Sequence, residues 1–453
     1  MLAALGFITV IVMLVLVMTK KASPTIALIG VPLITGIIAA FFFVTNPEAA
    51  PGVVDPVANI LGLGKMITSG IGTVAATGVM FIFSILFFGI LTDAGTFRPI
   101  IKGILGVIGT DPIKIALGTS ILAMIVHLDG SGAVTFLICV PALLPVYDAV
   151  GMRRTTLAAC VAMSAGVMNI MPWGGPTIRA ATALEMNVMD LFLPVLPAVI
   201  VGLIFVLVFA FLLGRKEKSR IGAVALAGVS THEEALTDEA KALLRPNLFP
   251  VNICLIILAI VGLIVGGKYG IKPEVVFMIM FVLAMVINYP SVKTQKERVN
   301  AHAQSAILMA SVLFAAGAFT GIMKGTGMIT AMAGALTSII PAAMGKFFPL
   351  ITGIIAMPAS LLFDPDSFYY GVLPVLGETA KGFGVPAVNV ARAAILGQMT
   401  AGFPVSPLTP ATFLLVGLAG VDFGEHQKKT IPLVWALSLI MLLVSIVIGA
   451  IMI

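Results

Sequence analysis

Ten long apolar stretches are the feature that most limits how this chain can fold. Each is about 17–25 residues long, the length that an α-helix needs to cross a hydrocarbon core of about 30 Å. With 60% hydrophobic and only 10% charged residues, the chain cannot keep them all in a water-soluble core. We therefore expect an all-α polytopic membrane protein with about ten crossings. The stretches begin near Leu2, Ser23, Gly70, Thr155, Met189, Pro250, Pro273, Ala301, Asn389 and Thr430.

Two further apolar segments are too short to cross. The segment from Ile113 to Val126 reaches only about 21 Å as a helix before the polar run that starts at His127. The segment from Phe347 to Leu362 likewise ends at F-D-P-D-S. Both predict re-entrant hairpins, which enter the membrane, turn at a polar tip and leave on the same side.

Two of the crossings contain helix-breaking residues at their middle. One runs from Thr155 to Leu184 and is broken at N-I-M-P-W-G-G-P-T; the other runs from Asn389 to Leu418 and is broken at G-F-P-V-S-P-L-T-P. A membrane tolerates such breaks only where protein covers the freed backbone or a wet cavity faces it. This pattern is typical of transporters.

The interruptions repeat along the chain at one constant interval. Gly89 and Gly321 are separated by the same interval as Pro172 and Pro404, and as Thr177 and Thr409. A shared interval predicts an internal duplication. Because each half has five crossings, the second half would be inverted relative to the first, as in the inverted repeats of secondary transporters.

The basic residues predict the orientation. With the N-terminus outside, 18 of the 26 Lys and Arg residues lie on the cytoplasmic side. The polar stretch 215–245 then forms a cytoplasmic linker. The excess of basic residues is accounted for by this topology and by contact with the lipid bilayer, so no nucleic-acid partner is expected.

The four breaks are the predicted binding site. Hairpin tips and broken helices of inverted repeats meet near the middle of the membrane, and the helix starts there favour anions such as carboxylates. Hydroxyls at these positions can bind a ligand or only cap a helix. The candidate substrate-binding residues are Gly130, Ser131, Gly132, Asn169, Gly174, Gly175, Thr177, Arg179, Ser367, Ser406 and Thr409.

Three acids at the hairpin tips are candidate cation ligands. They are Asp129, Asp364 and Asp366. Placing a charged carboxylate inside a membrane costs free energy, so acids found there are usually functional or paired. Their oxygens suit Mg²⁺ or Ca²⁺ as the bound cation, and a sodium ion or a proton is the alternative. Asp129 or Asp364 could instead only cap the helix that follows it. His127 and Asp129 are candidate proton carriers. Arg179 could clamp a carboxylate or form an internal ion pair.

At these motifs the sequence resembles the citrate–metal/proton symporter family, within a superfamily of elevator-type carriers. The resemblance implies import of citrate, or a related tricarboxylate, chelated to a divalent cation, with proton symport and no permanently bound cofactor. It also implies a homodimer in the bacterial inner membrane. The motifs are LDGSGAVT (128–135), MPWGGPTIR (171–179), FYYGVLPVL (368–376), SPLTPATFLLVGLAGV (406–421) and FGEHQK (423–428).

The resemblance also suggests a division of the chain. Residues 1–93 and 246–324 would form a scaffold, and 94–214 and 325–453 would each supply an arm, a hairpin and a transport part. The alternatives are a sodium-coupled or metal-free di- or tricarboxylate transporter and an anion channel. An enzyme is not expected, because the sequence has no HExxH, GxSxG or clustered histidines.

Overall fold

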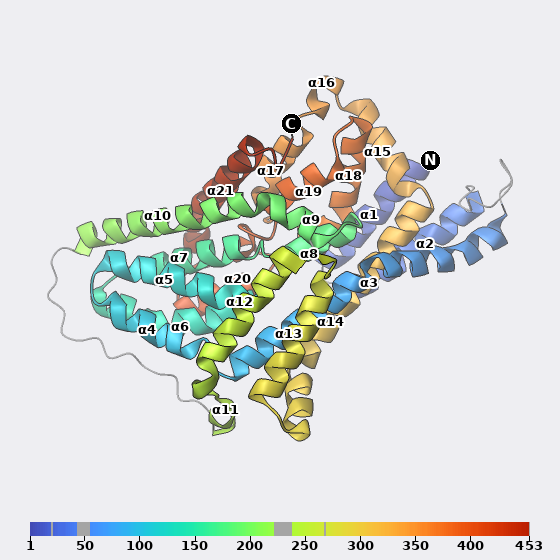
Figure 1. The fold of residues 1–453 in the computed structure, drawn as a ribbon. Coiled ribbons are helices and arrows are strands. Elements are labelled where there is room, and N and C mark those ends of the chain that lie inside the picture. The colour runs from blue at the N-terminus through green and yellow to red at the C-terminus, as the bar shows by residue number, and fades with distance from the viewer. Residues whose placement is uncertain (20, 43–54, 222–237, 267–268, 453) are drawn as a thin grey trace.

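The structure is a computed structural model that describes residues 1–19, 21–42, 55–221, 238–266 and 269–452. Every regular element in those ranges is helical, which confirms the predicted all-α class. In Figure 1, the long helices α3 (Pro56–Asp93) and α14 (Val292–Gly325) run side by side. Helices α10 (Leu196–Ile221) and α21 (Phe423–Val447) form a second pair at another edge.

The first half contains two helices before α3, then a short helix, a hairpin and a broken helix. Several helices begin with proline, whose missing N–H is not needed in the first turn. Asp55 and Asp111 precede two of these prolines and cap the helices that follow. The remaining elements are α1 (Leu2–Met18), α2 (Pro24–Phe42), α4 (Arg98–Ile108), α5 (Pro112–Val126), η1 (His127–Asp129), α6 (Gly132–Val150), α7 (Arg154–Met168), α8 (Gly175–Ala183), α9 (Val188–Phe192) and η2 (Leu193–Val195).

The second half repeats this order from α14 onward. The last residues of α3 and α14, Asp93 and Gly325, are separated by the same interval that relates the paired interruptions in the sequence. The other elements of the second half are α11 (Asp238–Leu243), η3 (Pro246–Leu248), α12 (Phe249–Gly266), α13 (Pro273–Asn288), α15 (Met328–Ile339), α16 (Ala342–Gly345), α17 (Phe348–Ala359), η5 (Ser367–Val372), α18 (Leu373–Gly382), α19 (Ala387–Ile395), η6 (Phe403–Val405) and α20 (Pro410–Ala419).

Helices α3 and α14 are antiparallel and touch at glycines. A β-carbon on Gly70 would lie 2.9 Å from the Cα of Gly321, so only glycine permits this approach. Further along α3, a β-carbon on Gly89 would lie 2.7 Å from the ring of His302. As the residue number rises along α3, the number of the residue that it contacts on α14 falls, so the two helices are antiparallel.

The hairpins and broken helices lie where the sequence predicts them. Helices α5 and α6 meet at a tip at residues 127–131, and α17 meets η5 through a tip at residues 360–366. The element η5 is a π-helical turn, a form common at functional sites. The broken crossings appear as α7 with α8 and as α19 with α20.

The predicted lengths of two crossings are wrong. Helix α3 has 38 residues and α14 has 34, and they begin well before the predicted starts at Gly70 and Ala301. Hydropathy detects only the most apolar part of a helix, whereas both helices have further turns before it. The first turns of α3 contact α2, where Asn59 donates to the Ala40 carbonyl at 3.0 Å, and those of α14 contact the end of α3, where Arg298 lies 3.2 Å from Asp93.

Within the described residues, eight helices are long and apolar enough to span a membrane. Two of them are the arms of the first hairpin, Pro112–Asp129 and Gly132–Val150, because the helix there continues beyond the predicted Val126. The re-entrant path of this hairpin and the ten crossings therefore remain predictions.

The predicted linker at 215–245 is only partly described. Residues 222–237 lie outside the described residues. At its start the chain is not a loop, because α10 continues to Ile221. The polar residues that suggested a linker there form the last turns of that helix.

Candidate functional site

The tip of the first hairpin is a tight, hydrogen-bonded turn. Gly130 turns the chain with a left-handed φ of 76°, a conformation that glycine adopts readily. An Asp129 side-chain oxygen accepts the backbone N–H of Ser131 at 2.8 Å, and the Ser131 hydroxyl accepts the N–H of Val134 at 3.3 Å. Ser131 therefore caps α6, and Asp129 holds the turn before it.

His127 fixes this tip to the second half of the chain. Its ring is fully buried, and its Nδ1 atom lies 2.8 Å from the Thr135 hydroxyl. The ring also stacks on Phe403 of η6, with centroids 5.9 Å apart. A β-carbon on Gly132 would lie 2.7 Å from Phe403, so the start of α6 sits directly against the second break.

The first break, between α7 and α8, contacts the first hairpin and the second break. The Trp173 indole N–H donates to the Leu128 carbonyl at 2.8 Å. The Asn169 amide donates to the Met399 carbonyl at 2.9 Å. These bonds satisfy carbonyls that no helix uses, which is the requirement for irregular backbone inside a membrane.

The start of α8 is built around small residues. A β-carbon on Gly174 would lie 2.3 Å from the Asn169 carbonyl oxygen, so that position needs glycine. A β-carbon on Gly175 would lie 2.7 Å from the Arg179 guanidinium. The Thr177 hydroxyl donates to the Ile170 carbonyl at 2.9 Å and ties the helix to the break before it.

The tip of the second hairpin is organised by Asp364. One oxygen of its side chain accepts the N–H groups of Asp366 and Ser367 at 3.0 and 3.1 Å, and the other accepts the Ser367 hydroxyl. Asp364 is thus used as a cap for the helix that follows, one of the alternatives considered for it.

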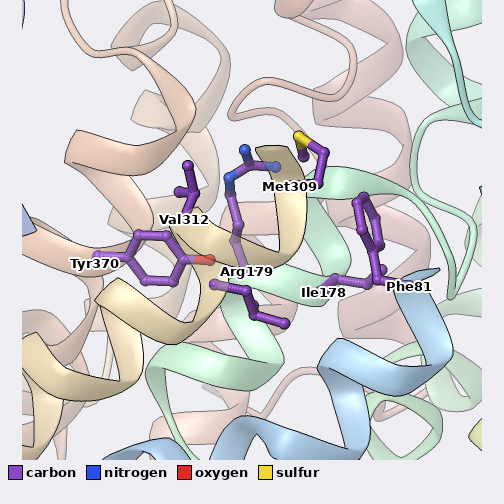
Figure 2. Close-up of a pocket in the computed structure, with 7 residues that line it drawn as sticks. Phe81, Ile178, Arg179, Met309, Val312 and Tyr370 are labelled. Carbon is purple, nitrogen blue, oxygen red and sulfur yellow. The ribbon is translucent and has the colours of Figure 1, made fainter. Parts of the chain in front are cut away.

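Arg179 forms an internal ion pair with Asp366. Its Nε atom lies 2.7 Å from a carboxylate oxygen of Asp366, and their side chains are only 10% and 12% exposed. Of the two roles left open for Arg179, the structure shows the ion pair. Figure 2 shows the Tyr370 hydroxyl pointing toward Arg179, beside a small cavity of about 10 Å³. This space is too small for a polycarboxylate.

The second break is held by the second hairpin. The Ser360 hydroxyl accepts the N–H of Met399 at 2.8 Å, and the Ser360 carbonyl accepts the hydroxyl of Ser406. The Tyr369 hydroxyl donates to the Gln398 carbonyl at 2.7 Å. The Thr409 hydroxyl donates to the Phe403 carbonyl at 2.9 Å, so it does not cap α20.

All four interruptions therefore meet through direct contacts, although the three candidate metal ligands do not gather at one point. Among the residues that the structure describes, no group of three or more His, Cys, Asp or Glu side chains could hold a metal ion. Asp366 is neutralised by Arg179, and Asp364 is occupied by the tip. Asp129 makes a single described hydrogen bond.

Comparisons with known proteins identify the family. The family described as "Citrate transporter" matches residues 10–397. A Bacillus subtilis protein named "Citrate transporter" is 41% identical over 451 residues and covers 100% of both chains. The chain belongs to the citrate transporter family. A second Bacillus subtilis relative, named "Mg(2+)/citrate complex secondary transporter", is 40% identical over 454 residues, covering 100% of this chain and 99% of its own.

Solved structures agree with the fold of this citrate transporter family member. The Alcanivorax borkumensis YdaH transporter matches with a TM-score of 0.62 at 13% identity, covering 95% of this chain and 99% of its own. Neisseria gonorrhoeae MtrF matches with a TM-score of 0.55 at 14% identity and covers 94% of each chain. The protein is a multi-pass membrane transporter.

Sequence reasoning missed several residues that hold the breaks of this family member. On α21, His426 lies 2.9 Å from the Pro404 carbonyl, and the Gln427 amide donates to the Val405 carbonyl at 2.8 Å. Ser360 was also overlooked. The FGEHQK motif contained the signal for the first two, but a histidine at a helix start has no obvious partner until the fold brings it to the break.

Proposed function

We propose that the protein imports citrate as a complex with a divalent cation and couples this import to proton symport. The observation that carries the proposal is the contact of each hairpin with each break, as between His127 and Phe403 and between Asp366 and Arg179. Helices α6, α8 and α20 begin there, and helix starts offer free N–H groups and a positive dipole end. Those groups suit carboxylates.

The substrate contacts would come from the residues around these helix starts. The small residues let the substrate approach the backbone closely, while hydroxyls and an amide add side-chain donors. Arg179 would act through its pair with Asp366, by shaping the wall of the site. The residues proposed to contact substrate are Gly130, Ser131, Gly132, Asn169, Gly174, Gly175, Thr177, Ser367, Ser406 and Thr409.

The cation, Mg²⁺ or Ca²⁺, would enter already bound by citrate. The relative named as a transporter of the Mg²⁺/citrate complex supports this, and so does the lack of a metal site of three or more such side chains among the described residues. Mg²⁺ usually keeps several of its bound waters, and a protein binds it through only one or two carboxylates together with groups of the substrate. Asp129 is the acid we propose to meet it, because Asp364 and Asp366 are occupied within the second tip.

The proton would be carried at the same tip, by Asp129 or His127. The two side chains belong to one turn, and the His127 Nδ1 atom already contacts the Thr135 hydroxyl at 2.8 Å. In symport the proton binds and leaves together with the metal–citrate complex, so it would be taken up at this tip from the outside and released on the inside with the cation. Sodium coupling is the alternative.

The movement would be an elevator motion of 112–214 and 345–453 against a scaffold of 1–93 and 246–324, with arms near 96–110 and 327–342. The antiparallel register of α3 and α14 supports an inverted relation of the halves. Aromatic contacts join the parts: Trp173 stacks on Phe88 at 5.6 Å and meets Phe277 edge-on at 5.7 Å. We also propose a scaffold-linked homodimer in the bacterial inner membrane.

Uptake of labelled citrate into proteoliposomes tests this function. Mg²⁺, Ca²⁺, Zn²⁺ or EDTA is added, and a proton or sodium gradient is imposed. We expect fastest uptake with Mg²⁺ or Ca²⁺ and an inward proton gradient. Fastest uptake with EDTA would exclude the metal complex, and a response to sodium alone would favour the sodium-coupled alternative. Single-channel currents would indicate an anion channel.

A further inference from the structure

An ion pair joins the proposed transport part to the proposed scaffold beside the end of α8. Glu185 follows α8 in the transport part, and it pairs with Lys324 in the last turn of α14, at the end of the scaffold. Of the ion pairs between residues that the structure describes, this one alone crosses from one part to the other. A contact that crosses this boundary must break when one part moves against the other.

Glu185 stands where the backbone favours glycine. It has a left-handed conformation, with φ of 53°, which residues with a β-carbon rarely adopt. The matching helix α20 ends in the same kind of turn with Gly420, whose φ is 61°. In both turns the following N–H bonds back to the carbonyl five residues earlier. A side chain kept in an unfavourable backbone conformation indicates a role for that side chain beyond the turn.

The other half of the chain has no counterpart of this pair. At the repeat interval of the sequence, Lys324 corresponds to Thr92, whose hydroxyl bonds back to a carbonyl of its own helix at 2.9 Å. Glu185 corresponds to Gly417 at the same interval and to Gly420 in the turn after the helix. A contact between the ends of α20 and α3 would therefore form without an ion pair.

The helices that follow the two breaks have different surroundings. Helix α8 packs on α14 and α3, and Trp173 just before it stacks on Phe88 of the scaffold at 5.6 Å. The main contacts of α20 are with α6, α7 and α21, in its own part. The structure therefore has the first break against the scaffold. Because the halves are proposed to be inverted repeats, the opposite end state would bring α20 to the scaffold instead.

We propose that Glu185 and Lys324 form a latch, which favours the state with the first break against the scaffold and opens when the transport part moves. This inference rests on the proposed function, because the elevator movement supplies the two states. An interaction made in only one state shifts the balance toward that state. The Lys324 side chain is 64% exposed and that of Glu185 is 20% exposed, so the pair is weak enough to open in every cycle.

Cross-linking tests whether the two ends part during transport. Glu185→Cys and Lys324→Cys are combined in a Cys254→Ser background, which leaves Cys139 and Cys160, both buried. The pair lines a cleft of about 730 Å³, so a reagent can reach both positions. A short bifunctional thiol reagent with a reducible spacer should abolish citrate uptake into proteoliposomes, and a reductant should restore it. Uptake that persists in fully cross-linked protein would overturn the latch.

Single-molecule energy transfer tests whether the charges favour one state. Lys296→Cys on α14 and Lys428→Cys on α21 place one dye on each part, and both lysines are exposed. We expect two levels of energy transfer, of which the cross-linked protein, labelled afterwards, keeps only the latched one. The mean dwell time at the latched level should shorten about twofold to fivefold in Glu185→Gln and in Lys324→Gln. Unchanged dwell times would overturn the latch.

The double variant Glu185→Gln with Lys324→Gln separates the pair from other charges, such as Lys65, which lines the same cleft. If the two side chains act on each other, the double variant should shorten the dwell time no more than either single variant. Effects that multiply would mean that the two side chains act independently, which would also overturn the latch.

The matched control is the pair of Glu378 and Lys381, which lie 2.9 Å apart within α18 of the transport part. Cross-linking two cysteines at these positions should leave uptake unchanged, and Lys381→Gln should leave the dwell time unchanged. Equal effects in the control would overturn the latch. Normal citrate uptake with unchanged dwell times would refute the latch alone, whereas absence of citrate uptake by the unmodified protein would refute the proposed function.

Discussion

The two hairpin tips have the same backbone plan and different charge balance. At the first tip, Asp129 accepts one backbone N–H and has no ion-pair partner among the residues that the structure describes. At the second tip, Asp364 accepts two N–H groups and a hydroxyl, and Asp366 is paired with Arg179. One tip is therefore electrostatically satisfied and the other is not.

This difference suggests a division of work between the halves. A neutralised ion pair such as Arg179–Asp366 keeps the same charge state throughout a transport cycle, so it suits a structural role. An acid without a partner at membrane depth is stable only if a proton or a cation compensates it. We therefore assign coupling to the first tip and rigidity to the second.

The largest expected effect is on the ion pair of the second tip. Arg179→Gln leaves a buried carboxylate without its partner and should lower the free energy of unfolding by about 3–5 kcal/mol. The double variant Arg179→Gln with Asp366→Asn should recover most of this loss. Thermal unfolding of purified protein in detergent measures both. A double variant no more stable than the single one would show that the pair is not the source of the stability.

The next effect is on transport and belongs to the first tip. Asp129→Asn should reduce metal-dependent citrate uptake about a hundredfold, because removing one partner of a buried charge contact costs about 3 kcal/mol, while expression and thermal stability remain. Asp364→Asn is the matched variant, and it should lose stability before it loses coupling, because Asp364 is a cap. Wild-type uptake by Asp129→Asn would reduce Asp129 to a cap as well and remove the contrast between the tips.

Sequence alone predicted the interruptions of the chain but not what holds them. The lengths of the apolar segments and the positions of Pro172, Pro404 and the tip glycines are local features, and local features fix where a helix stops. The constant interval between the halves then assigned each interruption to a pair. Helix α3 was predicted too short because its first turns, which contain Asn59 and Lys65, remain helical beside α2, where Asn59 donates to the Ala40 carbonyl at 3.0 Å.

The contacts across the site could not be read in the same way. Arg179 and Asp366 are 187 residues apart, and the sequence offered a ligand and an ion pair as equal alternatives for Arg179. His426 and Ser360 looked unremarkable because their partners lie in a distant break: the Pro404 carbonyl for His426, and the Met399 N–H and Ser406 hydroxyl for Ser360. Only the fold shows which freed backbone group lies near which partner.

Trp173 offers a smaller test of how each tip is held. Trp173→Phe keeps the aromatic contact with Phe88 but removes the hydrogen bond to Leu128, which should cost about 1 kcal/mol and lower the rate of uptake about fivefold. Ser360→Ala removes the hydrogen bond that the Ser360 hydroxyl accepts from the Met399 N–H at the second tip, and it should mainly lower the melting temperature. Equal effects of the two variants on uptake would contradict the proposed division of work.

The smallest expected effect concerns the bases of the hairpins. Asp111 caps α5 by accepting the N–H of Ile113 at 2.9 Å and pairs with Lys218 of α10, also at 2.9 Å. Within the described residues, α17 of the second hairpin follows Phe347, which provides no side-chain cap. The first hairpin thus has an electrostatic anchor at its base that the second lacks.

This anchor makes the first hairpin sensitive to acid. The hydrogen bond from Lys218 lowers the pKa of Asp111 below its usual value, so its contribution to stability is present above about pH 4 and is lost as the pH falls through the lowered pKa. Because both side chains are partly exposed, Asp111→Asn should cost at most about 1 kcal/mol at neutral pH. The gap in thermal stability between wild type and variant should narrow as the pH falls from 7 to 3. A gap that stays constant over this range would mean that Asp111 acts by packing, and the two hairpin bases would then differ in shape and not in charge.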